Sequence, residues 1–214
     1  MSSCPPNFCL IQIWIGFPIS ASYERLRGKK SEKMGTDIEK WLKEDGEKVL
    51  KEIGIKEGQV ILDFGCGSGI YSLPAAKVIG KEGKIYALDK NQTELDELMK
   101  RAESKGLKNI KIVKTSGDLK IPLKDESVET VLLYDVLHPY YFSVNERSKL
   151  LREVYRVLKP NALLSVYPEH MGLEEIKRQI EDVNFYFEVE YFKPIIHDGR
   201  YTDGHILNFR RSGE

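Results

Sequence analysis

The chain has 214 residues and no net charge: 33 Lys and Arg balance 33 Asp and Glu, 41% of the residues are hydrophobic and 31% are charged. This composition is typical of a globular domain and excludes a disordered or fibrous chain, and it gives no global electrostatic reason to bind nucleic acid or a membrane. The three cysteines match neither a closed disulfide framework nor a zinc motif, so no metal site is predicted and a cytoplasmic location is expected.

Residues 1–33 differ in composition from the rest of the chain. Segment 5–22 carries no charged residue and is mostly apolar over 8–19, which is too short for a transmembrane helix. No basic residue precedes it, as a secretory signal requires. Three interpretations stay open: an arm packed on the domain or a partner, a weak membrane or targeting element, or an upstream start with Met34 as the native one. The domain itself is predicted to span 34–214.

Apolar residues at helical spacing predict a first helix over 36–53, which Gly54 ends. A continuous apolar run then predicts a buried strand over 59–64. After a glycine-rich loop, a helix is expected over about 70–78. Pro74 falls in its first turns, where proline is tolerated.

The remainder of the chain alternates between strand and helix patterns. The expected strands are 84–89, 109–116, 127–137 and 162–168, and the expected helices are 93–105, 143–158 and 173–183. Ser143 and Glu146 have capping-box spacing, and Pro160 is expected to stop the helix that they open. Two final β-like runs, 185–193 and 205–211, are separated by a loop with turn signals.

This order of elements predicts an α/β fold: a Rossmann-like, doubly wound, mostly parallel seven-stranded sheet with helices on both faces. Because no helix separates the last two β runs, they are expected to form an antiparallel C-terminal hairpin at one edge of the sheet.

The loop G-C-G-S-G at 65–69 follows the first strand and precedes a helix, as a nucleotide-binding loop does. It departs from the dinucleotide fingerprint G-x-G-x-x-G, whose last position is Ile70 here. Asp89 stands 20 residues beyond the last glycine, at the end of the second strand, where an acid binds ribose hydroxyls. Cys66 is interpreted as a small packing residue.

Asp63, two residues before the loop, decides between possible ligands. A carboxylate about 4 Å from a phosphate repels it by roughly 4 kcal/mol at an effective dielectric constant near 20. An ammonium group reverses that sign. S-adenosylmethionine carries an ammonium, a sulfonium, a carboxylate and an adenosine, so it is the predicted ligand.

The stretch D-F-G-C-G-S-G, together with Asp89, resembles motif I and the following acidic position of class I S-adenosylmethionine-dependent methyltransferases. The resemblance continues through SGDLKIPLKDESVETVLLYDVLHPY and LREVYRVLKPNALLSVYP, and it covers about 49–211. Asn161 and Ala162 replace two glycines of the usual pattern; Asn tolerates the left-handed conformation. Within the class, the chain looks most similar to the small methyltransferase domains of ubiquinone and menaquinone biosynthesis.

The resemblance implies a set of cofactor contacts. Asp118 corresponds to the acid near the adenine amino group, and the end of the fourth strand lies under the transferred methyl. The predicted cofactor-binding residues are Asp63, Gly65, Cys66, Gly67, Gly69, Asp89, Lys90, Gly117, Asp118, Leu119 and Tyr134.

His138 and Asp135 are the predicted catalytic residues. His138 is a candidate general base or a group that orients the acceptor, with a loop histidine bonded to the backbone as the structural alternative. The aromatic residues at 140–142 either wall the acceptor site or anchor the loop. Residues 168–170 are a second polar group at the same rim, and three further candidates lie between the last two β runs: His197, Arg200 and Tyr201.

The predicted function is transfer of a methyl group from S-adenosylmethionine to a small-molecule acceptor. Alternatives are a methyltransferase acting on RNA or protein, a non-catalytic S-adenosylmethionine-binding module, and an NAD(P)-dependent oxidoreductase, which Ile70 and Asp63 disfavour. YDVL replaces the N-P-P-Y type tetrad at the fourth strand, so no DNA substrate is expected. Neither a membrane partner nor a metal is predicted, and a homodimer is a possibility.

Overall fold

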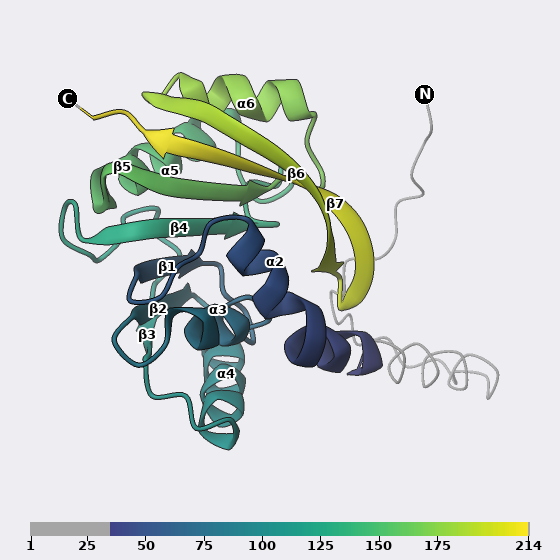
Figure 1. Cartoon of the computed structure of the whole chain (residues 1–214). Helices are drawn as coiled ribbons and strands as arrows, with labels where there is room; N and C mark the ends of the chain where they lie inside the picture. The colour runs from purple at the N-terminus through teal and green to yellow at the C-terminus, as the bar shows by residue number, and fades with distance from the viewer. Residues whose placement is uncertain (1–34, 214) are drawn as a thin grey trace, which may run out of the picture.

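The computed structural model describes residues 35–213 and contains one seven-stranded sheet in the order β3-β2-β1-β4-β5-β7-β6 (Figure 1). The first five strands in the chain are parallel, and β7 pairs antiparallel with both β5 and β6. The strands are β1 (Val60–Phe64), β2 (Lys84–Asp89), β3 (Ile110–Lys114), β4 (Val128–Tyr134), β5 (Leu158–Tyr167), β6 (Phe185–His197) and β7 (Arg200–Arg211). The predicted fold class is confirmed, including the antiparallel hairpin at one edge.

Helices cover both faces of the sheet (Figure 1). They are η1 (Trp41–Asp45), α2 (Gly46–Glu52), α3 (Ser72–Ile79), α4 (Gln92–Ser104), α5 (Val144–Val157) and α6 (Leu173–Glu181). One buried cluster joins η1, α2, α3 and α4 to the sheet, and a second cluster joins α5 and α6 to the opposite face.

Alternate strand residues divide the core between these two clusters. In β1, Ile61 packs with the α3 side and Leu62 with the α5 side, and all but the first residue of the strand are buried. In β4, Leu132 and Leu133 divide in the same way. Both strands are therefore mostly apolar, with Asp63 and Thr130 as buried polar exceptions, because successive side chains of a central strand enter different layers of the core.

The N-terminal helix is not the single regular helix expected over 36–53. Residues Trp41–Asp45 form a π-helical segment within it. This wider turn coincides with the burial of two consecutive large side chains, Trp41 and Leu42, which are 0% and 3% exposed. Trp41 Nε1 donates a hydrogen bond to the Ile70 carbonyl at 2.9 Å, so this segment holds the residue that follows the glycine loop.

Two other boundaries differ from those expected. Helix α3 begins at Ser72, two residues later than predicted, because Gly69 continues the loop in a left-handed conformation. Helix α5 carries the predicted capping box but passes directly into β5, so Pro160 lies within the strand instead of in a breaker loop. Asn161 adopts φ of +61°, as its replacement of a glycine requires.

The turn expected between the last two β runs is present at 197–200, but the predicted loop is too long. Strands β6 and β7 pair as far as His197 and Arg200, which leaves Asp198 and Gly199 as a two-residue turn with φ of +48° and +72°. Gly204 lies inside β7. Only glycine fits there, because a Cβ would meet Ile195 and Tyr167 side-chain atoms at 2.6 Å. Figure 1 shows the long hairpin curving over the end of the sheet.

The alternatives for residues 1–33 and for Met34 lie outside the described residues, and the bounds 34–214 stay a prediction. Within 35–213, no helix has the length and apolar character needed to cross a membrane.

Candidate active site

The residues predicted to form the site gather at the carboxyl ends of β1, β2, β3 and β4. Because the strand order is β3-β2-β1-β4, these ends form one continuous edge. The chain reverses its direction of winding between β1 and β4, and open α/β sheets bind ligands at such a switch point. The topology therefore brings together predicted site residues that are distributed over 63–138 in the sequence.

The glycine loop is bound to the end of β2 by backbone hydrogen bonds and turns sharply. The Gly65 and Cys66 amides donate to the Leu88 carbonyl at 2.8 and 3.1 Å. The loop glycines share positive φ angles, and they are Gly65 (+73°), Gly67 (+50°) and Gly69 (+86°). A Cβ on Gly69 would lie 2.2 Å from Leu98 Cδ1.

Gly67 differs from the other two glycines because its side-chain direction is open. A Cβ there would have Glu94 Oε2, at 3.9 Å, as its only near neighbour. A Cβ on Gly65 would instead lie 3.0 Å from Val136. The backbone at Gly67 can therefore approach a ligand closely, while Gly65 and Gly69 are needed for packing.

Asp89 links the loop to the end of β2. Its Oδ2 accepts a hydrogen bond from the Gly67 amide at 2.9 Å, and its Oδ1 accepts one from the Asn91 amide at 2.8 Å. Each carboxylate oxygen has two acceptor positions, so each keeps one for a ligand. The side chain is partly exposed. This arrangement fits a ribose diol.

Asp63 is buried beneath the loop, with 3% of the residue exposed. Ser72 Oγ donates to Asp63 Oδ2 at 2.5 Å. Burial raises the pKa of Asp63 from 3.8 to about 6, and the Ser72 hydrogen bond opposes that rise. The carboxyl is mostly ionised at neutral pH, but any effect on a ligand acts from below the loop.

Three carboxylates surround the loop, and all three affect the pKa of Cys66. Burial raises the pKa of the Cys66 thiol, and the negative charges of Asp63, Asp89 and Glu94 raise it further. The potential at the loop is thus unfavourable for phosphate and favourable for a cation. Glu94 was not among the predicted residues, because an acid in the first turn of a helix also stabilises that helix.

The loop after β3 completes this half of the site. A Cβ on Gly117 would lie 4.0 Å from Lys90 Cδ, so the loops after β2 and β3 are adjacent. Ser116 Oγ donates to Asp118 Oδ2 at 2.5 Å, and Asp118 is exposed. Leu119 packs against the α5-side cluster.

Tyr134 is buried at the end of β4, in the other half of the candidate site. Its ring contacts Tyr71 edge-on at a centroid distance of 4.6 Å, and its hydroxyl lies 3.0 Å from Ser165 Oγ. Only 6% of the residue is exposed. Tyr71, which sequence reasoning missed, donates a hydrogen bond to the Ile196 carbonyl at 2.7 Å and so fixes the end of β6 against the glycine loop.

Asp135 follows β4 and lies between two histidines. It adopts φ of +57°, an uncommon conformation for a non-glycine residue that is concentrated at functional sites. His197 Nδ1 lies 3.0 Å from Asp135 Oδ2, and His170 Nε2 lies 3.9 Å from Oδ1. The nearby Asp135 carboxylate raises the pKa of His197.

His138 stands beside this group, with its ring centroid 4.2 Å from that of His170. Burial and the neighbouring His170 lower the pKa of His138. Its Nδ1 accepts a hydrogen bond from the Tyr140 amide at 2.8 Å. The neutral ring therefore carries its proton on Nε2, which suits a hydrogen-bond donor better than a base. Tyr140 and Tyr141 are 68% and 55% exposed.

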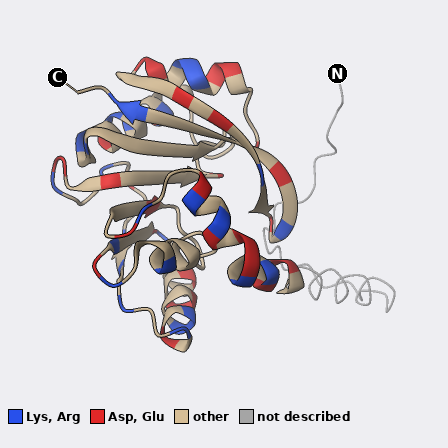
Figure 2. Cartoon of the chain, in the orientation of Figure 1, with Lys and Arg blue, Asp and Glu red and all other residues tan. Residues whose placement is uncertain are grey.

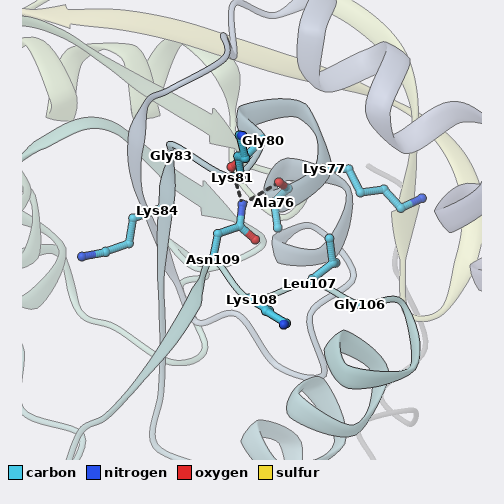
Figure 3. A pocket seen from close by; sticks show the side chains of 10 residues that line it. All are labelled: Ala76, Lys77, Gly80, Lys81, Gly83, Lys84, Gly106, Leu107, Lys108 and Asn109. Atoms are coloured by element: carbon cyan, nitrogen blue, oxygen red, sulfur yellow. Dashed lines mark hydrogen bonds between the residues drawn. The ribbon is translucent and has the colours of Figure 1, made fainter.

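A cavity of about 520 Å³ lies at the opposite end of the strands, near the start of β2. Figure 3 shows the side chains of Lys77 and Lys84 extending away from it in different directions, while Asn109 bonds the Ala76 and Gly80 carbonyls across its wall. None of the predicted site residues lines this cavity. We therefore do not assign the active site to this cavity, although it is large.

Comparison with known proteins agrees with this geometry. A sequence family described as a methyltransferase domain matches residues 61–161. Demethylmenaquinone methyltransferases from Geobacillus stearothermophilus and Listeria welshimeri are 28% and 30% identical over 68% and 69% of this chain. The chain spans 57% of the length of each of these relatives.

A solved structure supports the same relationship. The crystal structure of an S-adenosylmethionine-dependent methyltransferase from Aquifex aeolicus is 28% identical, with a TM-score of 0.67. The match covers 85% of this chain and 97% of that protein.

Proposed function

Because the chain belongs to the class I S-adenosylmethionine-dependent methyltransferase family, we propose that it transfers a methyl group from S-adenosylmethionine to a small-molecule acceptor. When bound, the cofactor supplies a methyl group on a positively charged sulfur, which is already activated for displacement. The relatives named above act on demethylmenaquinone, a small molecule, and this supports the acceptor class.

The observation that carries the proposal is the carboxylate-lined glycine loop. Asp89 has a free acceptor position on each oxygen for the ribose, Gly67 lets the backbone approach the amino-acid part, and Asp63 and Glu94 add negative potential for its ammonium. In our proposal the loops after β2 and β3, with Lys90 and Asp118, hold the adenine side.

Catalysis on this scheme is mainly alignment. An activated methyl needs a nucleophile held in line with it, and orientation supplies much of the rate. We propose that Asp135 and His138 hold the acceptor at the end of β4. Since His138 Nδ1 is occupied by the Tyr140 amide, its Nε2–H would donate a hydrogen bond to the acceptor. Tyr134 supports the floor beneath them.

The alternative substrates, RNA and protein, have less support. Figure 2 shows Lys and Arg interspersed with Asp and Glu along α2, α6 and the β6–β7 hairpin of the described chain. RNA binding depends on clustered cations that neutralise phosphates. An NAD(P)-dependent oxidoreductase is opposed by the negative potential at the loop, and a non-catalytic binding module would retain the cofactor without any acceptor.

Two measurements test the proposal. Calorimetry should detect binding of S-adenosylhomocysteine and no binding of NADH. Cell extract incubated with the protein and methyl-tritiated S-adenosylmethionine should then yield label in a small molecule that organic solvent or ultrafiltration separates from polymer. Label confined to RNA or protein would replace the acceptor class, and bound cofactor with no labelled product would favour the non-catalytic module.

Location and assembly are also part of the proposal. We infer a cytoplasmic protein, because the three cysteines suit a reducing compartment. We infer that a homodimer would use β6, the edge strand of the sheet, which carries the exposed aromatic residues Tyr186 and Phe192. Sedimentation would compare the oligomeric state of the protein and its Phe192→Lys variant, and the variant should be monomeric if the dimer uses β6.

A further inference from the structure

We propose that Asp135, His170 and His197 bind one divalent transition-metal ion at the carboxyl ends of β4, β5 and β6. The three residues are separated by 35 and 27 positions in the chain, so no spacing motif announces them. The strand order and the long hairpin bring them together. Three of the four histidines of the chain lie here, since His138 is beside the group.

The donor atoms lie at the separations of a ligand set. His197 Nδ1 is 3.0 Å from one Asp135 oxygen, His170 Nε2 is 3.9 Å from the other, and one ligand atom from each residue lies within 4.8 Å of the others. With metal–ligand bonds of about 2.1 Å, two ligands of a tetrahedral ion are about 3.4 Å apart. The observed distances fall on either side of that value.

The ion pair between His197 Nδ1 and Asp135 at 3.0 Å accounts for part of the arrangement but not for all of it. His197 Nδ1 is buried and has no aligned hydrogen-bond partner among the described residues. The 3.9 Å between His170 and Asp135 is too long for a hydrogen bond. Asp135 also keeps an unfavourable left-handed backbone conformation while its carboxylate lies between the two imidazoles. A shared cation would satisfy the buried nitrogen and both carboxylate oxygens.

The donor chemistry selects the kind of ion. Two imidazole nitrogens and one carboxylate oxygen suit Zn²⁺, Fe²⁺ or Co²⁺, whereas Mg²⁺ and Ca²⁺ prefer oxygen ligands. Three protein ligands leave at least one position open, as in catalytic and unlike structural zinc sites. The His170 side chain is 40% exposed, so an ion can reach this ligand from solvent.

A metal here would narrow the acceptor class, a step that rests on the proposed function. The site adjoins Tyr134 at the end of β4, beside the proposed position of methyl transfer. An acceptor hydroxyl coordinated to the ion would have a lowered pKa and release its proton to water. The acceptor would then be a molecule with a metal-coordinating hydroxyl group, and no protein base would be needed.

Cobalt titration tests the site without using activity. Untagged protein carrying Cys4→Ser and Cys9→Ser, which removes two competing thiols, is treated with a chelator, dialysed and titrated with Co²⁺ alone. We expect visible d–d absorption that saturates at one equivalent and is abolished by Zn²⁺. His170→Ala should weaken Co²⁺ binding at least about 100-fold, since even partners that only support a ligand contribute 10- to 100-fold.

His205→Ala is the matched control, because its imidazole pairs with Glu190 on the hairpin, away from this group. It should leave the titration unchanged. His170 is exposed, so its variant should keep the parent's circular dichroism and melting temperature. Absence of the absorption, or an unchanged titration in His170→Ala, overturns the metal site. Calorimetry with S-adenosylhomocysteine on the same samples shows separately whether the proposed function fails.

Discussion

The Asp89 carboxylate accepts hydrogen bonds from the Gly67 and Asn91 amides while keeping acceptor positions for a ligand. We predict that Asp89→Ala weakens S-adenosylhomocysteine binding at least about 10-fold, because a hydrogen bond to a charged group contributes about 1.5–3 kcal/mol. Calorimetry would measure the affinity, with the exposed Asp96→Ala as control. Unchanged affinity in Asp89→Ala would contradict the ribose assignment.

Asp63 tests the charge argument at the same scale. Its carboxylate lies under the loop, and at about 8 Å with an effective dielectric constant near 20 it would attract an ammonium by about 2 kcal/mol. Asp63→Asn should therefore weaken S-adenosylmethionine binding roughly 30-fold and leave adenosine binding nearly unchanged, since adenosine has no ammonium. Equal losses for the two ligands, measured by competition calorimetry, would show that Asp63 only supports the loop through Ser72.

At the scale of the elements, the loop between β1 and α3 contains glycines with different tasks. Gly69→Ala places a methyl against Leu98, which is fully buried, in a left-handed backbone. We predict a loss of about 3 kcal/mol in the free energy of unfolding, from overpacking of about 1–3 kcal/mol and backbone strain of about 1–2 kcal/mol. Urea denaturation would measure it.

Gly67→Ala is the matched control in the same loop, because its added methyl meets no protein atom closer than 3.9 Å. It should lose only about 1 kcal/mol through backbone strain, yet bind S-adenosylhomocysteine poorly. If both variants lost the same stability and the same affinity, the division of the loop into packing and ligand-facing glycines would be wrong.

The β6–β7 hairpin is the element that completes the proposed acceptor side. Tyr71 holds its end through hydrogen bonds in both directions with Ile196, at 2.7 and 3.2 Å. Tyr201 adds a contact from the other strand, donating to Asp45 Oδ2 at 2.8 Å. The N-terminal helix, the glycine loop and the hairpin are thus joined at the same edge, so the position of His197 depends on all three.

At the scale of the whole molecule, the free energy of unfolding should depend on pH through one buried acid, Asp63. The pKa of Asp63 is raised in the folded state, so its contribution favours folding below pH 3.8 and is lost as the pH rises through about 6. A rise from 3.8 to about 6 corresponds to about 3 kcal/mol. We predict that Asp63→Asn is less stable than, or equal to, the parent at low pH and gains relative stability between pH 4 and pH 7.

Urea denaturation of both proteins at several pH values in this window checks the prediction, because all other titrating groups are shared and cancel in the difference. A difference that does not change with pH would mean that Asp63 titrates normally despite its burial. S-adenosylhomocysteine should reduce the pH dependence if its ammonium favours the ionised form.

Periodicity and order along the chain were sufficient to predict the fold. Strands such as 84–89 and helices such as 173–181 follow from local apolar patterns, and the glycine loop with Asp89 follows from backbone conformation and hydrogen-bonding chemistry. These features depend on neighbouring residues or on one βαβ unit, so a linear sequence contains them.

Only the tertiary structure decided which distant residues meet. The hairpin is longer than the two predicted β runs, because Lys193–His197 pair with Arg200–Gly204 and this pairing overrides the turn signal at 202–204. That extension brings His197 to Asp135. The sequence determined the proposed cofactor side of the site, which is built locally, whereas the three-residue group at the proposed acceptor side exists only because non-local strand pairing places its members side by side.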